Sequence, residues 1–251
     1  MLFKKSGLIF YIILFNIGLY SQSLVTDRPD QTESAITVPL NSLQIETGFA
    51  YESLEEISIS IKNYSIAGTL IRYGIIDFLE LRFGGTYFIT EEEININGLG
   101  NLFTGIKANF LNEEINLVDF ALLVHTFLPI GASAYKPEQV EPQVIAAIAK
   151  SVFEEVSLSA NLGGRYSSVF DKMIYQYSAA MGISLTNKLS TFLEAYGYFI
   201  SSVEPVHNFD GGLTYLLSDD LQLDLSGGIG ISGIDSFWFV STGVSFRFNN
   251  L

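Results

Sequence analysis

The sequence predicts an all-β fold, an antiparallel transmembrane β-barrel of the outer-membrane type with about 12 strands. Three observations lead to this fold class. Apolar and polar residues alternate along most of the chain, and short connections alternate with longer ones. The mean hydropathy is positive, at +0.33, although no apolar run beyond residue 23 is long enough for a membrane helix. The length of 251 residues suits one domain, or at most two.

The first 23 residues are expected to be a signal peptide. Lys4 and Lys5 precede a largely apolar stretch, Gly7 to Tyr20, and Ser21 to Ser23 supplies small residues for cleavage. A retained membrane anchor is the alternative, but the stretch is shorter than the roughly 20 residues that a spanning helix needs. We therefore expect a cleaved export signal and a location in the outer membrane of a Gram-negative-type bacterium.

The alternation has a period of two, which is typical of strands. From Leu43 to Tyr51 the odd-numbered residues are apolar or threonine, and the even-numbered residues are polar or small. The same pattern recurs at 79–83, 156–163, 221–226 and 238–247, whereas 117–128 and 143–152 give no decisive register. Each strand is therefore expected to carry one apolar face and one polar face.

The lengths of the connections favour a membrane barrel over a secreted β-sandwich, which places no constraint on them. Short connections are expected at 75–77, 112–116, 153–155, 186–188 and 218–220. Mostly longer ones lie between them, at 88–97, 129–141, 166–172, 200–206 and 231–236, and only 53–56 is brief. Outer-membrane barrels have short periplasmic turns and longer outer loops. The predicted organisation is a signal peptide (1–23), an N-terminal periplasmic or lumen-plug segment (24–40) and the barrel (41–251).

The composition argues against several function classes. A net charge of −14 without a basic cluster disfavours nucleic acid, and the lack of cysteine excludes disulfides and thiolate chemistry. The two histidines and scattered carboxylates show no metal-ligand spacing, so no metal and no cofactor are expected. A hydrolase would need His207 and Asp210 together, but their odd spacing sends the two side chains to opposite faces of a strand. We expect no catalytic residue and no enzyme.

Residues 24–40 combine four charged side chains with no apolar alternation, so they are predicted to be neither a strand nor a lipid-facing element. These plug candidates are Asp27, Arg28, Asp30 and Glu33. If the segment enters the lumen, Arg28 is expected to meet lumen acids, and Asp27 or Asp30 to meet Arg72 or Arg82. The segment would then act as a plug or gate. A flexible tail is the alternative.

The predicted lumen face of the strands carries nearly balanced charge. Its acids are Glu46, Glu80, Glu194, Asp210 and Asp224, and its bases are Arg72, Arg82, Lys107, Arg165 and Arg247. A tight turn near Ile76 places Arg72 almost opposite Glu80, with Arg82 two residues further along the same face. Two interpretations are open: a ladder of ion pairs that fixes the register, because buried charges need partners, or a lining that sets the selectivity of a permeation path.

Aromatic residues supply a second candidate for selectivity. Phe192 and Tyr196 fall on the predicted lumen face. They would either fill the interior of a narrow barrel or form an apolar track for hydrophobic or aromatic solutes.

Several segments resemble one known family. They are Thr26 to Ala35, Val38-Pro39 with Leu43 to Phe49, Leu70 to Arg82, Leu128 to Gly131 and Asp210 to Tyr215. They resemble the outer-membrane transporter family known as the MetA-pathway of phenol degradation family, over most of the mature chain. The resemblance implies an outer-membrane barrel that acts as a transporter.

Together these features predict a monomeric outer-membrane channel that passes small molecules by passive diffusion, with hydrophobic or aromatic solutes as the candidate class. Its expected partners are outer-membrane lipid, lipopolysaccharide and the small-molecule solute. The alternatives are a structural or adhesive surface barrel with acidic loops and, less favoured, an outer-membrane hydrolase.

Overall fold

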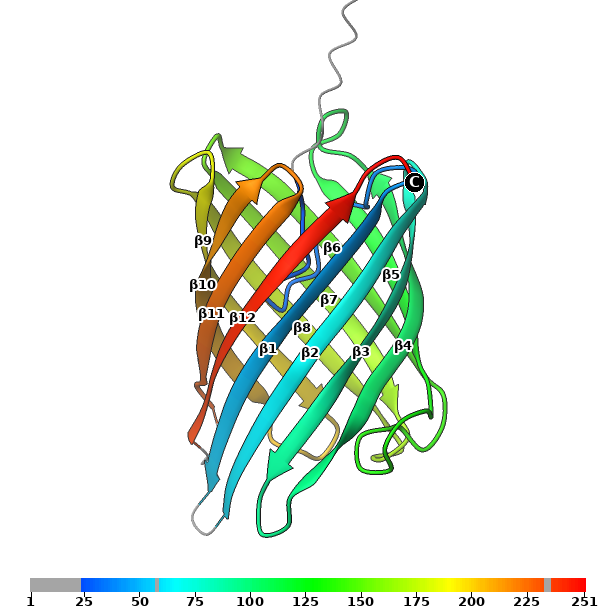
Figure 1. Ribbon diagram of the computed structural model, residues 1–251, viewed down its shortest axis with the longest axis vertical. Helices are drawn as coiled ribbons and strands as arrows, with labels where there is room; N and C mark the ends of the chain where they lie inside the picture. Colours follow the sequence, from blue (N-terminus) through cyan, green and yellow to red (C-terminus); the bar gives the residue numbers. More distant parts are fainter. Residues whose placement is uncertain (1–23, 57–58, 233–235) are drawn as a thin grey trace, which may run out of the picture.

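The computed structural model describes residues 24–56, 59–232 and 236–251, so the predicted signal peptide (1–23) lies outside the described residues. Twelve antiparallel strands close into one barrel, in which β1 pairs with both β2 and β12 (Figure 1). The strands are β1 (Leu43–Glu56), β2 (Ile59–Ile76), β3 (Leu79–Glu91), β4 (Ile96–Leu111), β5 (Asp119–Phe127), β6 (Glu141–Phe153), β7 (Val156–Ser167), β8 (Lys172–Ser184), β9 (Leu189–Ile200), β10 (Val206–Ser218), β11 (Leu221–Gly230) and β12 (Ser236–Phe248). The predicted all-β, twelve-stranded antiparallel barrel is confirmed.

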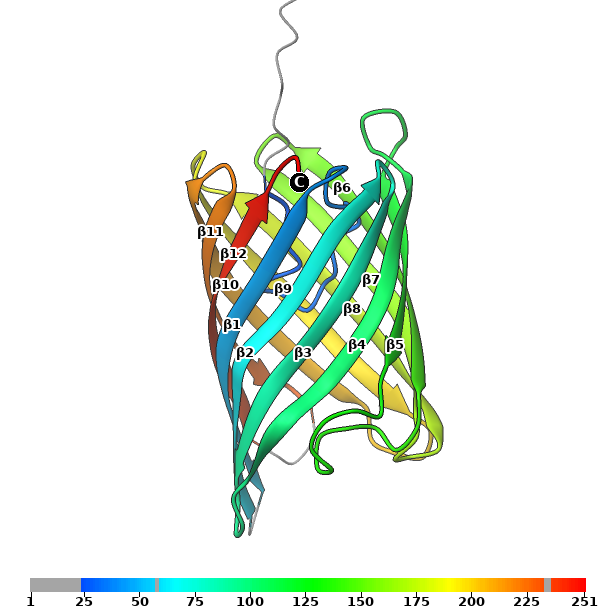
Figure 2. The same ribbon diagram turned by 45° about the vertical axis from the view of Figure 1, so that its right-hand side comes forward.

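The two faces of the strands are inverted relative to a water-soluble barrel. On β3, Leu81 and Phe83 are 47% and 48% exposed on the outside, whereas Glu80 and Arg82 are 0% and 2% exposed inside. The strands have 9 to 18 residues, and strands of this length can cross a bilayer. They are tilted relative to the barrel axis (Figure 2). An apolar exterior around a charged interior is the arrangement of a transmembrane barrel.

Among the residues that the structure describes, no helix is long and apolar enough to cross a membrane.

The predicted connections are found, with changes at some boundaries, but the expected contrast in length between the two ends is weaker: the connection 112–118 is longer than 92–95, 168–171 and 201–205 at the other end. The end that carries the start of β1 and the end of β12 has connections at 77–78, 112–118, 154–155, 185–188 and 219–220. The connection predicted at 53–56 belongs to β1, and the one predicted at 88–97 shrinks to 92–95. The reason is that the hairpin ladders continue to Glu55↔Ser60 and Lys62↔Glu91, where polar side chains outside the apolar band still pair.

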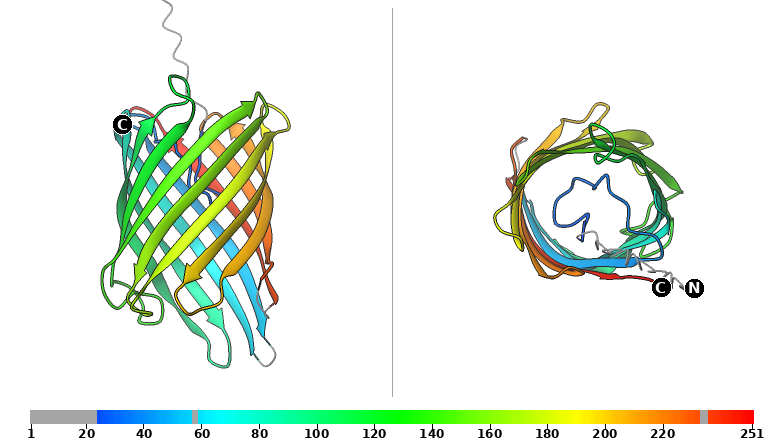
Figure 3. Two further views of the ribbon diagram at one scale, coloured as in Figure 1. Left: turned by 180° about the vertical axis from the view of Figure 1, so that it is seen from behind. Right: turned by 90° about the horizontal axis from the view of Figure 1, so that it is seen from above.

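Residues 24–42, the described part of the chain before β1, lie inside the barrel. Viewed along the barrel axis, they loop across the interior (Figure 3). We call residues 24–42 the lumen segment. It leaves the wall beside β2, where the Asn41 N–H donates to the Gly74 carbonyl at 2.9 Å. A Cβ on Gly74 would lie 2.2 Å from the Pro39 carbonyl oxygen, so only glycine lets the segment pass this close to the wall.

The strands without a decisive register, β5 and β6, are apolar on both faces. Ala121, Leu123, Ile145 and Ala147 point inward and pack with Ala35 of the lumen segment. Val124 and Val144 point outward and are 41% and 50% exposed. The apolar inner face exists because it contacts protein rather than water, which removes the usual polar signal of a lumen-facing position.

Candidate functional site

Asp27 of the lumen segment is the centre of a buried ion network. Its Oδ2 lies 2.7 Å from Nη1 of Arg82 and 3.3 Å from Nη1 of Arg72, and its Oδ1 lies 3.0 Å from Nζ of Lys107. These bases come from three neighbouring strands, β2, β3 and β4. Burial alone would raise the pKa of Asp27, but the three cations outweigh it and hold the pKa well below its usual value.

The wall supplies the other anions of this network. Nε of Arg72 lies 2.9 Å from Oε1 of Glu80, so the expected pair forms, and Nη1 of Arg72 lies 3.0 Å from Oε1 of Glu46. Arg72 and Arg82 are direct neighbours in the β2–β3 ladder. Such like charges repel, and Glu80 relieves the repulsion because it also lies 2.9 Å from Arg82.

Two further charges of the lumen segment are paired with the wall. Glu33 lies 2.7 Å from Nη2 of Arg82, and Nη2 of Arg28 lies 3.0 Å from Oδ1 of Asp224 on β11. The Arg28 guanidinium rests over Gly48 and Gly243, a directly paired glycine couple of β1 and β12. A Cβ on Gly243 would lie 2.5 Å from Nε of Arg28. The glycine couple therefore makes room for the arginine.

Backbone groups of the segment are bound by the far wall as well. The Gln31 N–H donates to Glu194 on β9 at 2.7 Å, and the Glu33 N–H donates to Asn161 on β7 at 2.7 Å. The Val38 N–H donates to Glu80 at 2.7 Å. Because the chain makes no ladder here, these side chains satisfy buried amides that would otherwise lack partners. The segment is therefore held on opposite sides of the barrel.

The remaining predicted wall charges do not join this network. Nε of Arg165 is 2.7 Å from Glu141, at the barrel end far from the β1 start, and Arg247 is 2.8 Å from Asp220 at the other end. The expected place of Glu141 in an outer loop was wrong, because it is the first residue of β6. Asp210 is 1% exposed, and its side chain shares a hydrogen bond with that of Glu194, its direct neighbour in the β9–β10 ladder.

The interior is more acidic than the sequence predicted. The lumen segment adds more acids than bases to the wall, and Glu52 of β1 also faces the interior. The interior acids are Asp27, Asp30, Glu33, Glu46, Glu52, Glu80, Glu194, Asp210 and Asp224, against the bases Arg28, Arg72, Arg82 and Lys107. The expectation of near-neutrality was wrong because it counted the strands alone and included Arg165 and Arg247, which lie at the ends.

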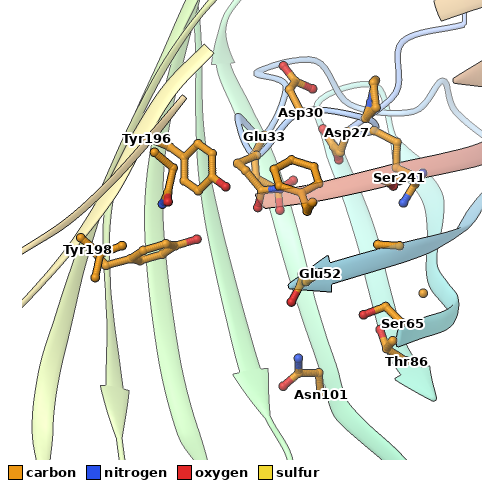
Figure 4. Close-up of a pocket in the computed structure, with 18 of the residues that line it drawn as sticks. Asp27, Asp30, Glu33, Glu52, Ser65, Thr86, Asn101, Tyr196, Tyr198 and Ser241 are labelled. Atoms are coloured by element: carbon orange, nitrogen blue, oxygen red, sulfur yellow. Dashed lines mark hydrogen bonds between the residues drawn. The ribbon is translucent and has the colours of Figure 1, made fainter. Parts of the chain in front are cut away.

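A cavity of about 950 Å³ lies beside the lumen segment and reaches the β9–β10 connection. Tyr196 and Tyr198 point into it from β9, towards the side that carries Asp30 and Glu52 (Figure 4). Phe192, the other aromatic candidate, is 7% exposed but is not among the lining residues. Sequence reasoning missed Glu52 as a site residue, although it shares the polar face of Gln44 and Glu46.

The groups that a hydrolase or a metal site would need are not brought together. His207 Nδ1 is 2.9 Å from the Tyr177 hydroxyl, and the burial pattern of β10 places Asp210 on the inner face and His207 on the other. In the described part of the chain, no group of three or more histidine or acidic side chains is placed to hold a metal ion.

The fold is similar to those of several solved outer-membrane proteins. The COG4313 outer membrane channel from Pseudomonas putida F1 aligns with a TM-score of 0.64 at 12% identity, over 86% of this chain and 98% of that one. The KdgM porin in complex with disordered oligogalacturonate gives 0.53 at 10% identity, over 81% and 99%, and the NanC porin gives 0.52 at 8%, over 80% and 100%. At these identities the likeness concerns the fold.

No curated protein sequence matches the chain. The family profile described as "Putative MetA-pathway of phenol degradation" matches residues 26–248, a span that includes Asp27, the wall charges and nearly all of the barrel. The chain belongs to this family, in agreement with the resemblance found in its sequence motifs.

Proposed function

We propose that this protein is a monomeric outer-membrane channel that passes small solutes by passive diffusion, and that the lumen segment acts as its plug. One observation carries the proposal: the segment is anchored across the interior by Asp27 and Arg28, and beside it lies a cavity that reaches one end of the barrel.

The chemistry of the two faces supports a channel. The exterior presents apolar side chains to lipid, whereas the interior is lined by charged and hydroxyl groups that solvate polar solutes. The fold is also shared with outer-membrane channels and porins. The proposed path runs through the cavity and past the lumen segment.

Solute entry into liposomes tests the proposal. Vesicles carrying the refolded full-length mature chain should admit small sugars slowly, and a variant lacking residues 24–40 should admit them faster, because the interior is no longer crossed. Asp27→Asn serves as a second variant that removes one anchor without shortening the chain. Resistance to unfolding at room temperature in detergent verifies that each barrel has folded.

The outcomes separate the two parts of the proposal. Equal sugar entry in the full-length and shortened proteins would overturn the plug but leave the channel. No entry in any of the three proteins, each folded, would overturn the channel and favour a structural or adhesive barrel.

A further inference from the structure

We propose that the cavity is a binding site for small organic cations, specifically amines that carry an aromatic ring. This inference deepens the proposed function and rests on it, because the cavity lies on the proposed path. The family description names phenol degradation and no amine, and the preference for an ammonium group rests on the side chains around the cavity.

Acidic groups around the cavity lack basic partners. Glu194 and Asp210 are directly opposite each other in the β9–β10 ladder, and Asp30 lies close enough for its charge to interact with both. Glu194 accepts hydrogen bonds from Gln31 and Thr32, which are neutral donors. In the described part of the chain, no ion pair involves any of these three acids.

Asp210 adds negative potential from behind the cavity wall. Its side chain is almost fully buried and shares a hydrogen bond with Glu194, so one carboxyl of the pair holds a proton and the other keeps its charge. Asp30 and Glu52 line the cavity itself, whereas Asp210 and Glu194 are not among its lining residues. A Cβ on Gly228 would lie 2.6 Å from Cβ of Asp210 and 2.5 Å from the Phe239 ring, so this acid is next to an aromatic residue that lines the cavity. Burial of an unpaired charge is costly, and a cation nearby relieves that cost.

The same acids disfavour anions as ligands. The only bases that line the cavity in the described residues are Arg28 and Arg82. Arg28 is paired with Asp224, and Arg82 is shared among Asp27, Glu33 and Glu80. An anionic solute would therefore meet acids without a base left to bind it.

The shape of the site favours an organic cation over a bare metal ion. The acids are spread around the cavity, and no cluster of the described residues has metal-binding geometry. Tyr196 and Tyr198 form an edge-to-face pair with ring centroids 6.2 Å apart, and Phe239 lines the cavity near Asp210. Aromatic faces attract ammonium groups and also stack on a ligand ring. The cavity volume of about 950 Å³ is suitable for a small organic molecule.

Three probes that differ only in charge test this inference. Tyramine carries an ammonium group at the end of a two-carbon chain, tyrosol replaces it with a neutral hydroxyl, and 3-(4-hydroxyphenyl)propionate replaces it with a carboxylate. Calorimetric titration of the detergent-solubilised full-length mature protein should show tyramine binding about tenfold more tightly than tyrosol, and no binding of the carboxylate. Asp30→Asn and Glu52→Gln should each weaken tyramine binding severalfold without changing tyrosol binding.

Asp219→Asn, which removes an exposed acid in the β10–β11 turn, is the matched control and should leave tyramine affinity unchanged. Tyrosol binding as tight as tyramine binding, or unchanged tyramine affinity in both cavity variants, would overturn the inference. Sugar entry into liposomes, measured on the same preparation, reports on the channel separately. Sugar entry without amine preference would overturn only the amine site, and amine binding without sugar entry would overturn only the channel.

Discussion

Asp27 and Arg82, 55 residues apart in the sequence, form an ion pair of 2.7 Å inside the barrel. The pair reduces an excess of positive charge on the inner face of the wall. Arg72, Arg82 and Lys107 face only Glu46 and Glu80 as wall acids within the network. Asp27 and Glu33 supply further negative charge from the lumen segment, so the segment and this part of the wall are electrostatically complete only together.

Substitution Asp27→Asn should release the lumen segment from this part of the wall. The change removes the nearest anionic partner of Lys107, which keeps only Glu80 at 3.8 Å, and removal of one partner of a buried ion pair typically costs about 3–5 kcal/mol. We expect faster proteolysis within residues 24–42 and faster sugar entry into liposomes. The control, Asp219→Asn, changes the net charge equally at an exposed turn and should match the unmodified protein. Unchanged protease resistance in Asp27→Asn would show that the network does not hold the segment.

A double substitution should restore what Asp27→Asn loses. Lys107 is paired with Asp27 at 3.0 Å, so Lys107→Met removes the cation that Asp27→Asn leaves without its nearest partner. The double variant is expected to be more resistant to protease than Asp27→Asn alone, because replacement of both partners avoids a buried unpaired charge. The proteolysis rates of the unmodified protein, the two single variants and the double variant together give the coupling free energy between Asp27 and Lys107. Additive effects would contradict the charge-balance argument.

Gly243→Ala should displace Arg28 with little damage to the barrel. The atoms nearest to the new Cβ all belong to the Arg28 guanidinium, which is the movable end of its side chain. The Arg28–Asp224 pair should weaken, and proteolysis of the lumen segment should accelerate to the rate seen with Arg28→Ala. Gly68→Ala is the control, because its new Cβ would meet no atom closer than 3.4 Å. Equal proteolysis of the two glycine variants would argue against this role of Gly243.

The barrel was predictable from the sequence because the period of two is a local property of each strand. The Arg72–Glu80 ion pair was expected and forms, but the expected register was wrong by two residues: Arg72 lies opposite Arg82, and Glu80 lies opposite Gly74. The pair still forms because all three side chains share the inner face. The inward faces of β5 and β6 were not predictable, because Ala121 and Ile145 pack on Ala35, which is distant from them in the sequence. The cavity also escaped prediction, since its position depends on the path of a segment without regular structure.

Tyr196→Leu should weaken tyramine binding, whereas Phe192→Leu should not. The two residues lie on the same strand and are similarly buried, at 6% and 7% exposure, but only Tyr196 lines the cavity. Loss of one aromatic face removes a cation–π contact of about 0.5–2 kcal/mol, so tyramine affinity should fall about two- to thirtyfold. Calorimetric titration of both variants checks this. Similar loss of affinity in both would indicate a general effect of packing.

Tyramine binding should strengthen as pH rises. Burial, first, and the neighbouring charge of Glu194, second, raise the pKa of Asp30 well above its usual 3.8; Asp27 and Asp210 also face this carboxyl. Its acidic form therefore persists to a higher pH than in a free aspartic acid, and the stability of the docked segment decreases as pH rises from 3.8 through the raised pKa. An ammonium group favours the ionised carboxylate, and an alkylamine keeps its charge to about pH 10.

The affinity for tyramine, measured from about pH 5 to pH 8, is therefore expected to increase in the unmodified protein and to vary less in Asp30→Asn. Tyrosol, titrated over the same range, corrects for any change in the barrel itself, because it carries no charge. A parallel rise for both probes would place the titrating group outside the cavity. A flat profile for tyramine in the unmodified protein would contradict this prediction, because binding would then release no proton from Asp30.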